Sequence, residues 1–277
     1  MALSMAALPP LSLPARADLA AVTSQTAETI TLIDTERMSV LAQIAVPGKP
    51  AAVAVDPDRG RIAAVAVESG MVHVLDPDGR PLVAARVGAH PFGIAFAPDG
   101  LLLVGDSGQG GQMHEVDPAS LTILRSHPAG AWPAGLDQVG PWRAIAIRDE
   151  DRLLIQGPDG TRSVAVGHHP FGVTLHQGRA FVTNVLDHDV SVVDLESARQ
   201  IARIPTGKRP YAVTFAEGRG FVSNQDDASV SVFDDTMQRI DARTLQIIDE
   251  IQLPPGPRAF GRFVGLDQPG AAPRGRP

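Results

Sequence analysis

The stretch AFVTNVLDHDVSVVDL at residues 180–195 returns as GFVSNQDDASVSVFDD at residues 220–235. Each copy begins with an apolar run, continues through an Asn and a polar turn, and ends with an alternating V-S-V run before Asp. Similar sequences separated by 40 residues indicate a fold built from repeated supersecondary units.

Six short phrases that open with proline extend this repeat over the chain. In each phrase, the second residue after the proline is Gly or Ala and the third is apolar. Proline suits the first residue of a strand, and a small residue allows neighbouring sheets to approach closely. The prolines are Pro50, Pro91, Pro133, Pro170, Pro210 and Pro257, and the small residues are Ala52, Gly93, Gly135, Gly172, Ala212 and Ala259.

Each unit contains four short runs with strand-like alternation, separated by turn residues. The third run ends in an Asp that is expected to cap the following turn, as at Asp76 and Asp194. Four strands in about forty residues are typical of a β-propeller blade.

Counting the units predicts how the ring closes. Five complete units begin at Pro50, Pro91, Pro133, Pro170 and Pro210. Residues 18–48 supply three strands without an inner one, and residues 257–266 supply an inner strand alone. We therefore expect an all-β, six-bladed propeller of four-stranded antiparallel blades, whose last blade contains both ends of the domain. A ring of seven blades is the alternative.

The segment FVTN…VSVVDL…IARIPTGKRPYAVTF resembles the YVTN repeat of exported bacterial and archaeal β-propellers, the lactonase-like superfamily. The resemblance covers nearly the whole chain after residue 18, although residues 101–130 and 138–167 depart from it. It implies a propeller that is usually exported. It implies no particular activity, because propellers serve many functions.

Composition limits the function classes further. The chain has 277 residues, a net charge of −7 and no cysteine, so neither a basic field for nucleic acid nor a thiolate site is expected. Residues 1–17 are apolar and end in Ala15-Arg16-Ala17, which resembles a signal peptide and its cleavage site. We expect a periplasmic or secreted single propeller domain over residues 18–266, without a membrane span, followed by a disordered tail over residues 267–277.

The residues next to the repeated prolines are the candidate ligand-binding residues. The connection into each inner strand should lie at one mouth of the central channel, where basic side chains would attract a small anion. The alternative is that these exposed positions collect polar residues for backbone reasons alone. The candidates are Lys49, His90, Trp132, His169, Arg209 and Arg258.

His90, His168 and His169 are weak candidates for a metal site, because imidazole binds several transition metals. The acidic turns Asp149–Asp151, Asp187–Asp189 and Asp226-Asp227 are predicted to be solvated turns. No catalytic or phosphate-binding motif is recognisable, and no cofactor is expected.

The sequence therefore favours an exported binding or scaffold protein, expected to be a monomer, whose partner is a small anion or a segment of another protein. The alternative is an enzyme or enzyme subunit, either a lactonase-like hydrolase or the propeller component of a periplasmic redox system.

Overall fold

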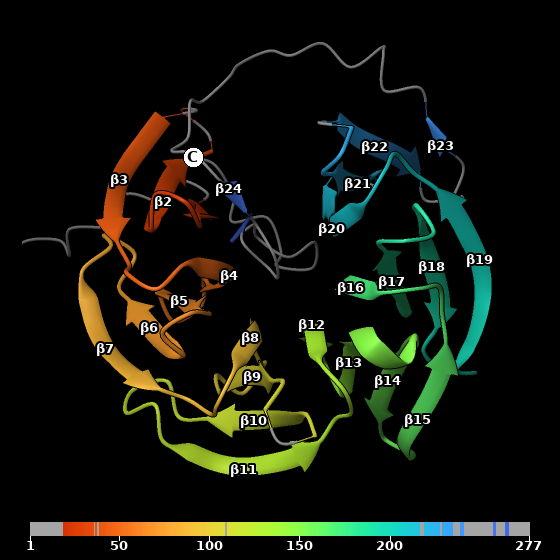
Figure 1. Cartoon of the computed structure of the whole chain (residues 1–277), viewed down its shortest axis with the longest axis horizontal. Helices are drawn as coiled ribbons and strands as arrows, with labels where there is room; N and C mark the ends of the chain where they lie inside the picture. The colour runs from red at the N-terminus through yellow and green to blue at the C-terminus, as the bar shows by residue number, and fades with distance from the viewer. Residues whose placement is uncertain are drawn as a thin grey trace, which may run out of the picture.

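The computed structural model describes residues 19–35, 37, 39–108, 110–216, 219–227, 229–234, 239–240, 257–258 and 264–265. Six small antiparallel sheets stand in a ring around a central axis (Figure 1). This arrangement confirms the six-bladed propeller over the seven-bladed alternative. The predicted leader at residues 1–17 and tail at residues 267–277 lie outside the described residues.

Five blades begin at the predicted prolines, and in each the chain runs from the innermost strand outward. The first two are β4 (Pro50–Asp56), β5 (Arg61–Ala66), β6 (Met71–Leu75) and β7 (Pro81–Arg86), then β8 (Pro91–Phe96), β9 (Leu102–Asp106), β10 (Gln112–Val116) and β11 (Ile123–Pro128). The third contains β12 (Pro133–Val139), β13 (Trp142–Ile147), the short 3₁₀ helix η1 (Arg148–Glu150), β14 (Arg152–Gly157) and β15 (Gly160–Ala165). The last two are β16 (Pro170–His176), β17 (Arg179–Asn184), β18 (Asp189–Asp194) and β19 (Arg199–Pro205), then β20 (Pro210–Ala216), β21 (Arg219–Asn224), β22 (Ser229–Asp234) and β23 (Arg239–Ile240).

The sixth blade joins the two ends of the domain, as predicted. It contains β1 (Leu19–Ser24), β2 (Thr29–Asp34) and β3 (Ser39–Ala45), with β24 (Pro257–Arg258) and β25 (Val264–Gly265) on the inner side of β1. Ser24 pairs with Pro257, and Ala20 pairs with Val264. Within the described residues, the predicted inner strand is thus two short paired segments. This shared sheet protects edges that would otherwise be open.

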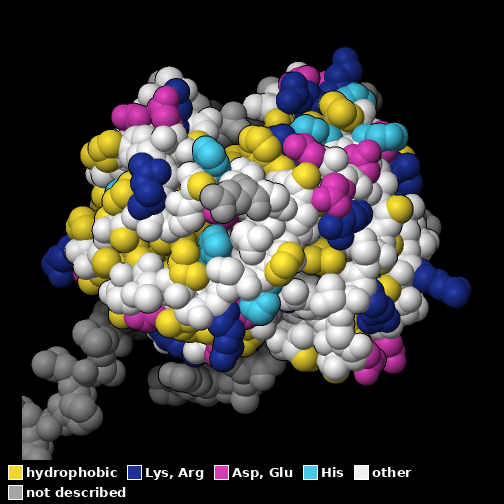
Figure 2. Space-filling model, turned by 60° about the horizontal axis from the view of Figure 1, so that its bottom comes forward, with side chains coloured by type: hydrophobic (Ala, Val, Ile, Leu, Met, Phe, Trp, Pro, Cys, Tyr) yellow, Lys and Arg dark blue, Asp and Glu magenta, His cyan; other side chains and the backbone are white. Residues whose placement is uncertain are grey.

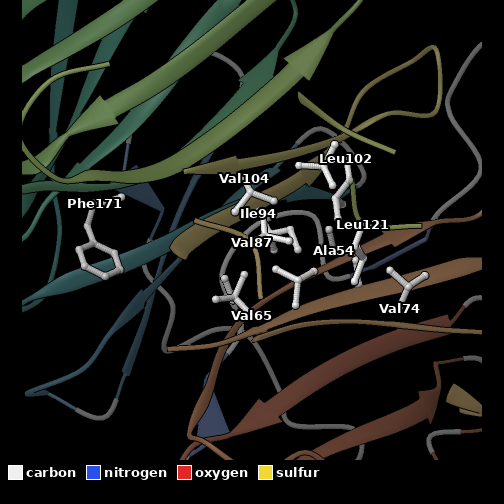
Figure 3. Close-up of a cluster of buried hydrophobic side chains, with 14 of the residues drawn as sticks. Ala54, Val65, Val74, Val87, Ile94, Leu102, Val104, Leu121 and Phe171 are labelled. Atoms are coloured by element: carbon white, nitrogen blue, oxygen red, sulfur yellow. The ribbon is translucent and has the colours of Figure 1, made fainter. Parts of the chain in front are cut away.

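The core lies between the blades. In the cluster between the first two complete blades, Ala54, Val65 and Val74 face Ile94, Leu102 and Val104 (Figure 3). The second strands β5, β9 and β17 are buried along almost their whole length, because each blade is covered on both faces by a neighbour. The outer strands β7 and β11 are largely exposed. Strand alternation is therefore clear only at the rim.

The small residue after each proline allows the blades to approach, as the sequence predicted. A Cβ built on Gly93 would collide with the carbonyl oxygen of Ala134 in the next blade, and one on Gly172 would collide with that of Tyr211. A register shift lies at this point in all five complete blades, for example between Pro170 and Val173. Such a bulge bends the strand and increases its local twist.

The repeated polar residues hold turns and loops together. Asp76 and Asp194 accept hydrogen bonds from the backbone N–H groups of Asp78 and Ser197, which confirms the predicted caps. Asn184, from the V-T-N motif, accepts one from Gly167 N–H at 3.1 Å and donates to Ser191 Oγ at 2.8 Å. The motif Asn therefore ties the inter-blade connection to its own blade.

Candidate ligand site at the channel mouth

The residues before the prolines share one backbone position at the mouth. The carbonyl oxygen of each accepts a hydrogen bond from the residue that follows the second strand of its blade, for example from Arg148 N–H to Trp132 O at 2.9 Å. Lys49, Trp132, His169 and Arg209 have left-handed backbone angles, with φ between 54° and 60°. This repeated geometry places Lys49, His90, Trp132, His169 and Arg209 around the start of the inner strands.

An aromatic row lies at the start of the inner strands, next to this ring. The ring centroids of Trp132 and Phe92 lie 6.3 Å apart, those of Phe92 and Phe171 lie 5.4 Å apart, and those of Phe171 and Tyr211 lie 4.7 Å apart. A cavity of about 20 Å³ between the inner strands, lined by Phe92, Phe171 and their neighbours, has space for about one water molecule. This cavity is too small for a larger ligand.

Sequence reasoning did not find this row, although a signal was present. Phe92, Phe171 and Tyr211 each follow a repeated proline directly. The Tyr211 ring lies against that of Phe171. An aromatic residue directly after the proline is therefore the sequence signal for three of the four rings.

Two guanidinium groups lie at the ends of the aromatic row. Arg148 lies over the Trp132 ring, with 3.3 Å between the guanidinium carbon and the ring centroid. Arg209 donates from Nη2 to the Tyr211 hydroxyl at 3.1 Å. Cations near aromatic faces are stabilised by the ring quadrupole, so both are held against the terminal rings of the row. Arg148 was not a sequence candidate because it does not precede a proline.

Carboxylates lie beside the cations of the mouth. Lys49 Nζ lies 3.1 Å from Glu68 Oε1, and Arg209 Nε lies 3.9 Å from Asp226 Oδ1. Figure 2 shows basic, acidic and histidine side chains next to one another on the visible surface. Any positive funnel therefore has to act together with these counter-charges.

The acidic turns do more than face solvent. Asp151 accepts a hydrogen bond from His169 N–H, Asp187 accepts one from His168 N–H, and Asp227 accepts one from Lys208 N–H. Burial by itself would raise the pKa of Asp187, but hydrogen bonds from the His168 backbone and side chain and from Arg203 lower it to about 2. These carboxylates thus fix the inter-blade connections, which is a structural role that the solvated-turn prediction omitted.

The two neighbouring histidines have opposite shifts. Burial, followed by the charge of Arg148, lowers the pKa of His169 below 6.5, and Arg209 contributes in the same direction. His168 is exposed, and its hydrogen bond to Asp187 at 2.8 Å raises its pKa. A bound anion next to His169 would stabilise its protonated form and so raise its lowered pKa.

The metal hypothesis gains no geometric support within the described ranges. No group of three or more His, Asp or Glu side chains there is placed to bind one ion. His168 contacts Asp187, whereas His90 is exposed and donates its backbone N–H to Asp106. The side chain of the remaining ring candidate, Arg258, lies outside the described residues, although its backbone pairs with Thr23.

Comparison with known proteins supports the architecture. Streptogramin B lyase is 15% identical with a TM-score of 0.67, and the match covers 91% of this chain and 89% of that one. The chain is a β-propeller. A Bacteroides caccae protein of unknown function is 14% identical with a TM-score of 0.67, covering 88% of this propeller and 98% of that chain. The dihydro-heme d1 dehydrogenase NirN is 19% identical with a TM-score of 0.60, covering 84% of this propeller and 56% of that chain.

No protein-family model matches the propeller, and no curated protein matches its sequence at a significant level. At identities this low the structural likeness shows the fold alone. The described part of the chain contains no helix with the length and apolar character needed to cross a membrane.

Proposed function

We propose that this chain is an exported propeller of the YVTN-repeat type that binds a small organic anion at the mouth of its channel. The observation that carries the proposal is the pairing of an aromatic row with a guanidinium group at each end, Arg148 over Trp132 and Arg209 beside Tyr211. The row offers an apolar surface for the body of a ligand. The guanidinium groups offer donors for its carboxylate, although Arg148 also donates to Asp149 from Nε at 2.7 Å and from Nη2 at 3.3 Å, so a ligand would compete with that carboxylate.

Arg209 is the central residue in this proposal. Its ion pair with Asp226 is long, at 3.9 Å, and its Nε has no hydrogen-bond partner among the described residues. A ligand carboxylate could satisfy this donor after a small rearrangement of the side chain. Lys49 and Glu68 are both more than half exposed, and such surface pairs contribute little stability, so Lys49 can also turn toward a ligand.

Export is supported by the apolar segment that closes with Ala15-Arg16-Ala17. Expression of the full chain in a bacterial host, followed by fractionation and mass measurement, tests this part separately. A mature chain that starts near residue 18 in the periplasm supports export, and an uncleaved cytoplasmic chain contradicts it.

Calorimetric titration with benzoate, acetate and phosphate tests the site. We expect benzoate to bind more tightly than acetate, because its ring can cover the aromatic row. Arg209→Gln should weaken benzoate binding about tenfold or more, since a charge-assisted hydrogen bond contributes about 1.5–3 kcal/mol. Arg80→Gln is the matched control, because Arg80 is exposed and pairs with Asp76 and Asp78 in the turn between β6 and β7. Equal benzoate affinity in both variants would contradict the proposal.

The pH dependence of binding gives an independent test. The pKa of His169 is lowered in the free protein, and a bound anion would favour its protonated form. Benzoate affinity should therefore rise as the pH falls below about 6.5, and His169→Gln should remove this rise. An affinity of the wild type that is unchanged between pH 7.5 and pH 5 would exclude His169 from the site.

A further inference from the structure

Three polar residues occupy matching positions on adjacent strands of the β8–β11 blade, from Asp106, which binds the backbone of His90, to the outermost strand. Asp106 ends β9, His114 lies in β10 and pairs with Ser126 of β11. In the β16–β19 blade the matching positions contain Asn184, Ser191 and Arg203. In the β12–β15 blade they contain Ile147, Leu154 and Ser163. The β8–β11 blade thus places an ionisable pair directly behind a serine.

The hydrogen bonds fix the roles of these groups. His114 Nδ1 lies 2.8 Å from Ser126 Oγ, and His114 Nε2 lies 3.4 Å from Asp106 Oδ2. Burial would raise the pKa of Asp106, but the backbone N–H groups of Gly108, Ala89 and His90 and the side chain of His114 lower it. The carboxylate is therefore ionised and accepts a hydrogen bond from Nε2–H. Nδ1 is then the acceptor, and the Ser126 hydroxyl donates to it.

The ionisable pair is shielded from water, whereas the serine is accessible. Asp106 and His114 are 4% and 6% exposed, and Ser126 is an exposed residue on the outermost strand of its blade. Gly88 covers the pair with φ at +74°, and a Cβ there would collide with the Asp106 carboxylate. A reagent in solvent can therefore approach Ser126, while the two groups behind it are buried.

The backbone of Ser126 also offers a donor at the blade edge. Ala129 N–H bonds to Gly111 O at 3.1 Å, and counting along the register makes His114–Ser126 a non-hydrogen-bonded pair. The N–H of Ser126 therefore points away from β10. Pro128 lies two residues further along β11, so its pair with Gln112 is of the same type. Because Pro128 has no N–H to donate to β10, it agrees with this assignment. A donor on the nucleophile's own N–H is a recurring way to stabilise the oxyanion in acyl transfer.

We propose that Ser126 is a nucleophile for small activated carboxylic esters, with His114 as its general base and Asp106 as the group that orients His114. Ser126 Oγ attacks the ester carbonyl carbon while its proton passes to His114 Nδ1. The bond to the leaving oxygen then breaks, and this oxygen takes the proton from His114. A water molecule then gives a proton to the same nitrogen and attacks the acyl carbon. The bond from this carbon to Ser126 Oγ breaks, the carboxylic acid leaves, and His114 returns the proton to Oγ.

Labelling with a fluorophosphonate probe tests the nucleophile directly. In this step the Ser126 Oγ–P bond forms, fluoride leaves and His114 takes the proton. Peptide mass mapping of the full wild-type chain should show Ser126 labelled about 100-fold or more faster than Ser163, because a positioned base contributes about 10²–10⁴-fold. Ser163 is the internal control, since it has the same register position with Leu154 behind it. Labelling of Ser126 no faster than Ser163 would overturn the proposal.

Variants and an ester substrate extend the test. Ser126→Ala should abolish both fast labelling and the hydrolysis of 4-nitrophenyl acetate, whereas Ser163→Ala should change neither. His114→Gln should slow Ser126 labelling by a similar factor of about 100, and far-UV circular dichroism checks that it folds. Hydrolysis that persists in Ser126→Ala would also contradict the assignment. The outcome is independent of benzoate binding, because none of these three residues belongs to the mouth ring.

Discussion

The β16–β19 and β8–β11 blades solve one structural problem with different chemistry. In the first, neutral Asn184 both accepts from a backbone N–H and donates to Asp189 and Ser191. In the second, Asp106 accepts backbone hydrogen bonds from Ala89, His90 and Gly108, while His114 supplies the side-chain donor. The Asn184 amide of one blade thus corresponds to the buried Asp106–His114 pair of the other. The same repeat position has a structural role in the first blade, and it contains ionisable groups in the second.

The β12–β15 blade contains a third solution. Ile147 occupies the position and is fully buried, and the connection is held instead by Glu150, which accepts a hydrogen bond from Ala131 N–H. The repeat therefore requires the loop to be anchored but does not require a particular residue. Departures from the motif are where chemistry can enter without loss of the fold.

The largest difference in stability between the two blades is expected when the acid and the amide are exchanged. Asn184→Asp removes the donors to Asp189 and Ser191 and places a carboxylate beside that of Asp189. We expect it to lower the free energy of unfolding by about 3 kcal/mol, because the new buried carboxylate has no donor to offer Asp189 and Ser191. Asp106→Asn can keep an acceptor oxygen for the N–H groups of His90 and Gly108 but loses the one for Ala89 N–H, and should cost about 1–2 kcal/mol. Urea unfolding at pH 7 measures both, and equal losses would show that the two positions are not distinct.

Acid titration sharpens the same contrast. The folded-state pKa of Asp106 is lowered from 3.8, so its ionisation stabilises the protein above that pH. This contribution is lost as the pH falls through the lower folded-state pKa. Asp106→Asn should therefore lose less stability than wild type between about pH 5 and pH 3. Asn184→Ala is the control and should give a curve parallel to that of wild type; a parallel curve for Asp106→Asn would contradict the expectation.

The smallest effect concerns the two hydroxyl groups. Ser191 is fully buried and accepts a hydrogen bond from Asn184, so Ser191→Ala should cost about 1 kcal/mol. Ser126 is exposed, and Ser126→Ala should change the free energy of unfolding by less than about 0.5 kcal/mol. Thermal unfolding of both variants checks this order. A larger loss for Ser126→Ala would mean that its hydroxyl has a structural role.

The sequence predicted the fold far better than the sites. The proline, the small residue and the apolar residue that follow one another in each unit predicted the start of five inner strands and the closing role of Pro257. The pre-proline residues were predicted to ring the mouth, and five of them share one backbone position before the inner strands. Whether they bind an anion stays a prediction. The carboxylates beside them were present in the sequence as acidic turns, but their partners were not readable.

The sequence by itself determined the blade count and the shared last blade, because each depends on signals that recur within forty residues. Only the tertiary structure decided which side chains meet. Phe92, Trp132, Phe171 and Tyr211 come from four blades and touch only after the ring closes. Asp106, His114 and Ser126 meet because bulges and strand register determine which face each side chain occupies, and a shift of one residue would separate them.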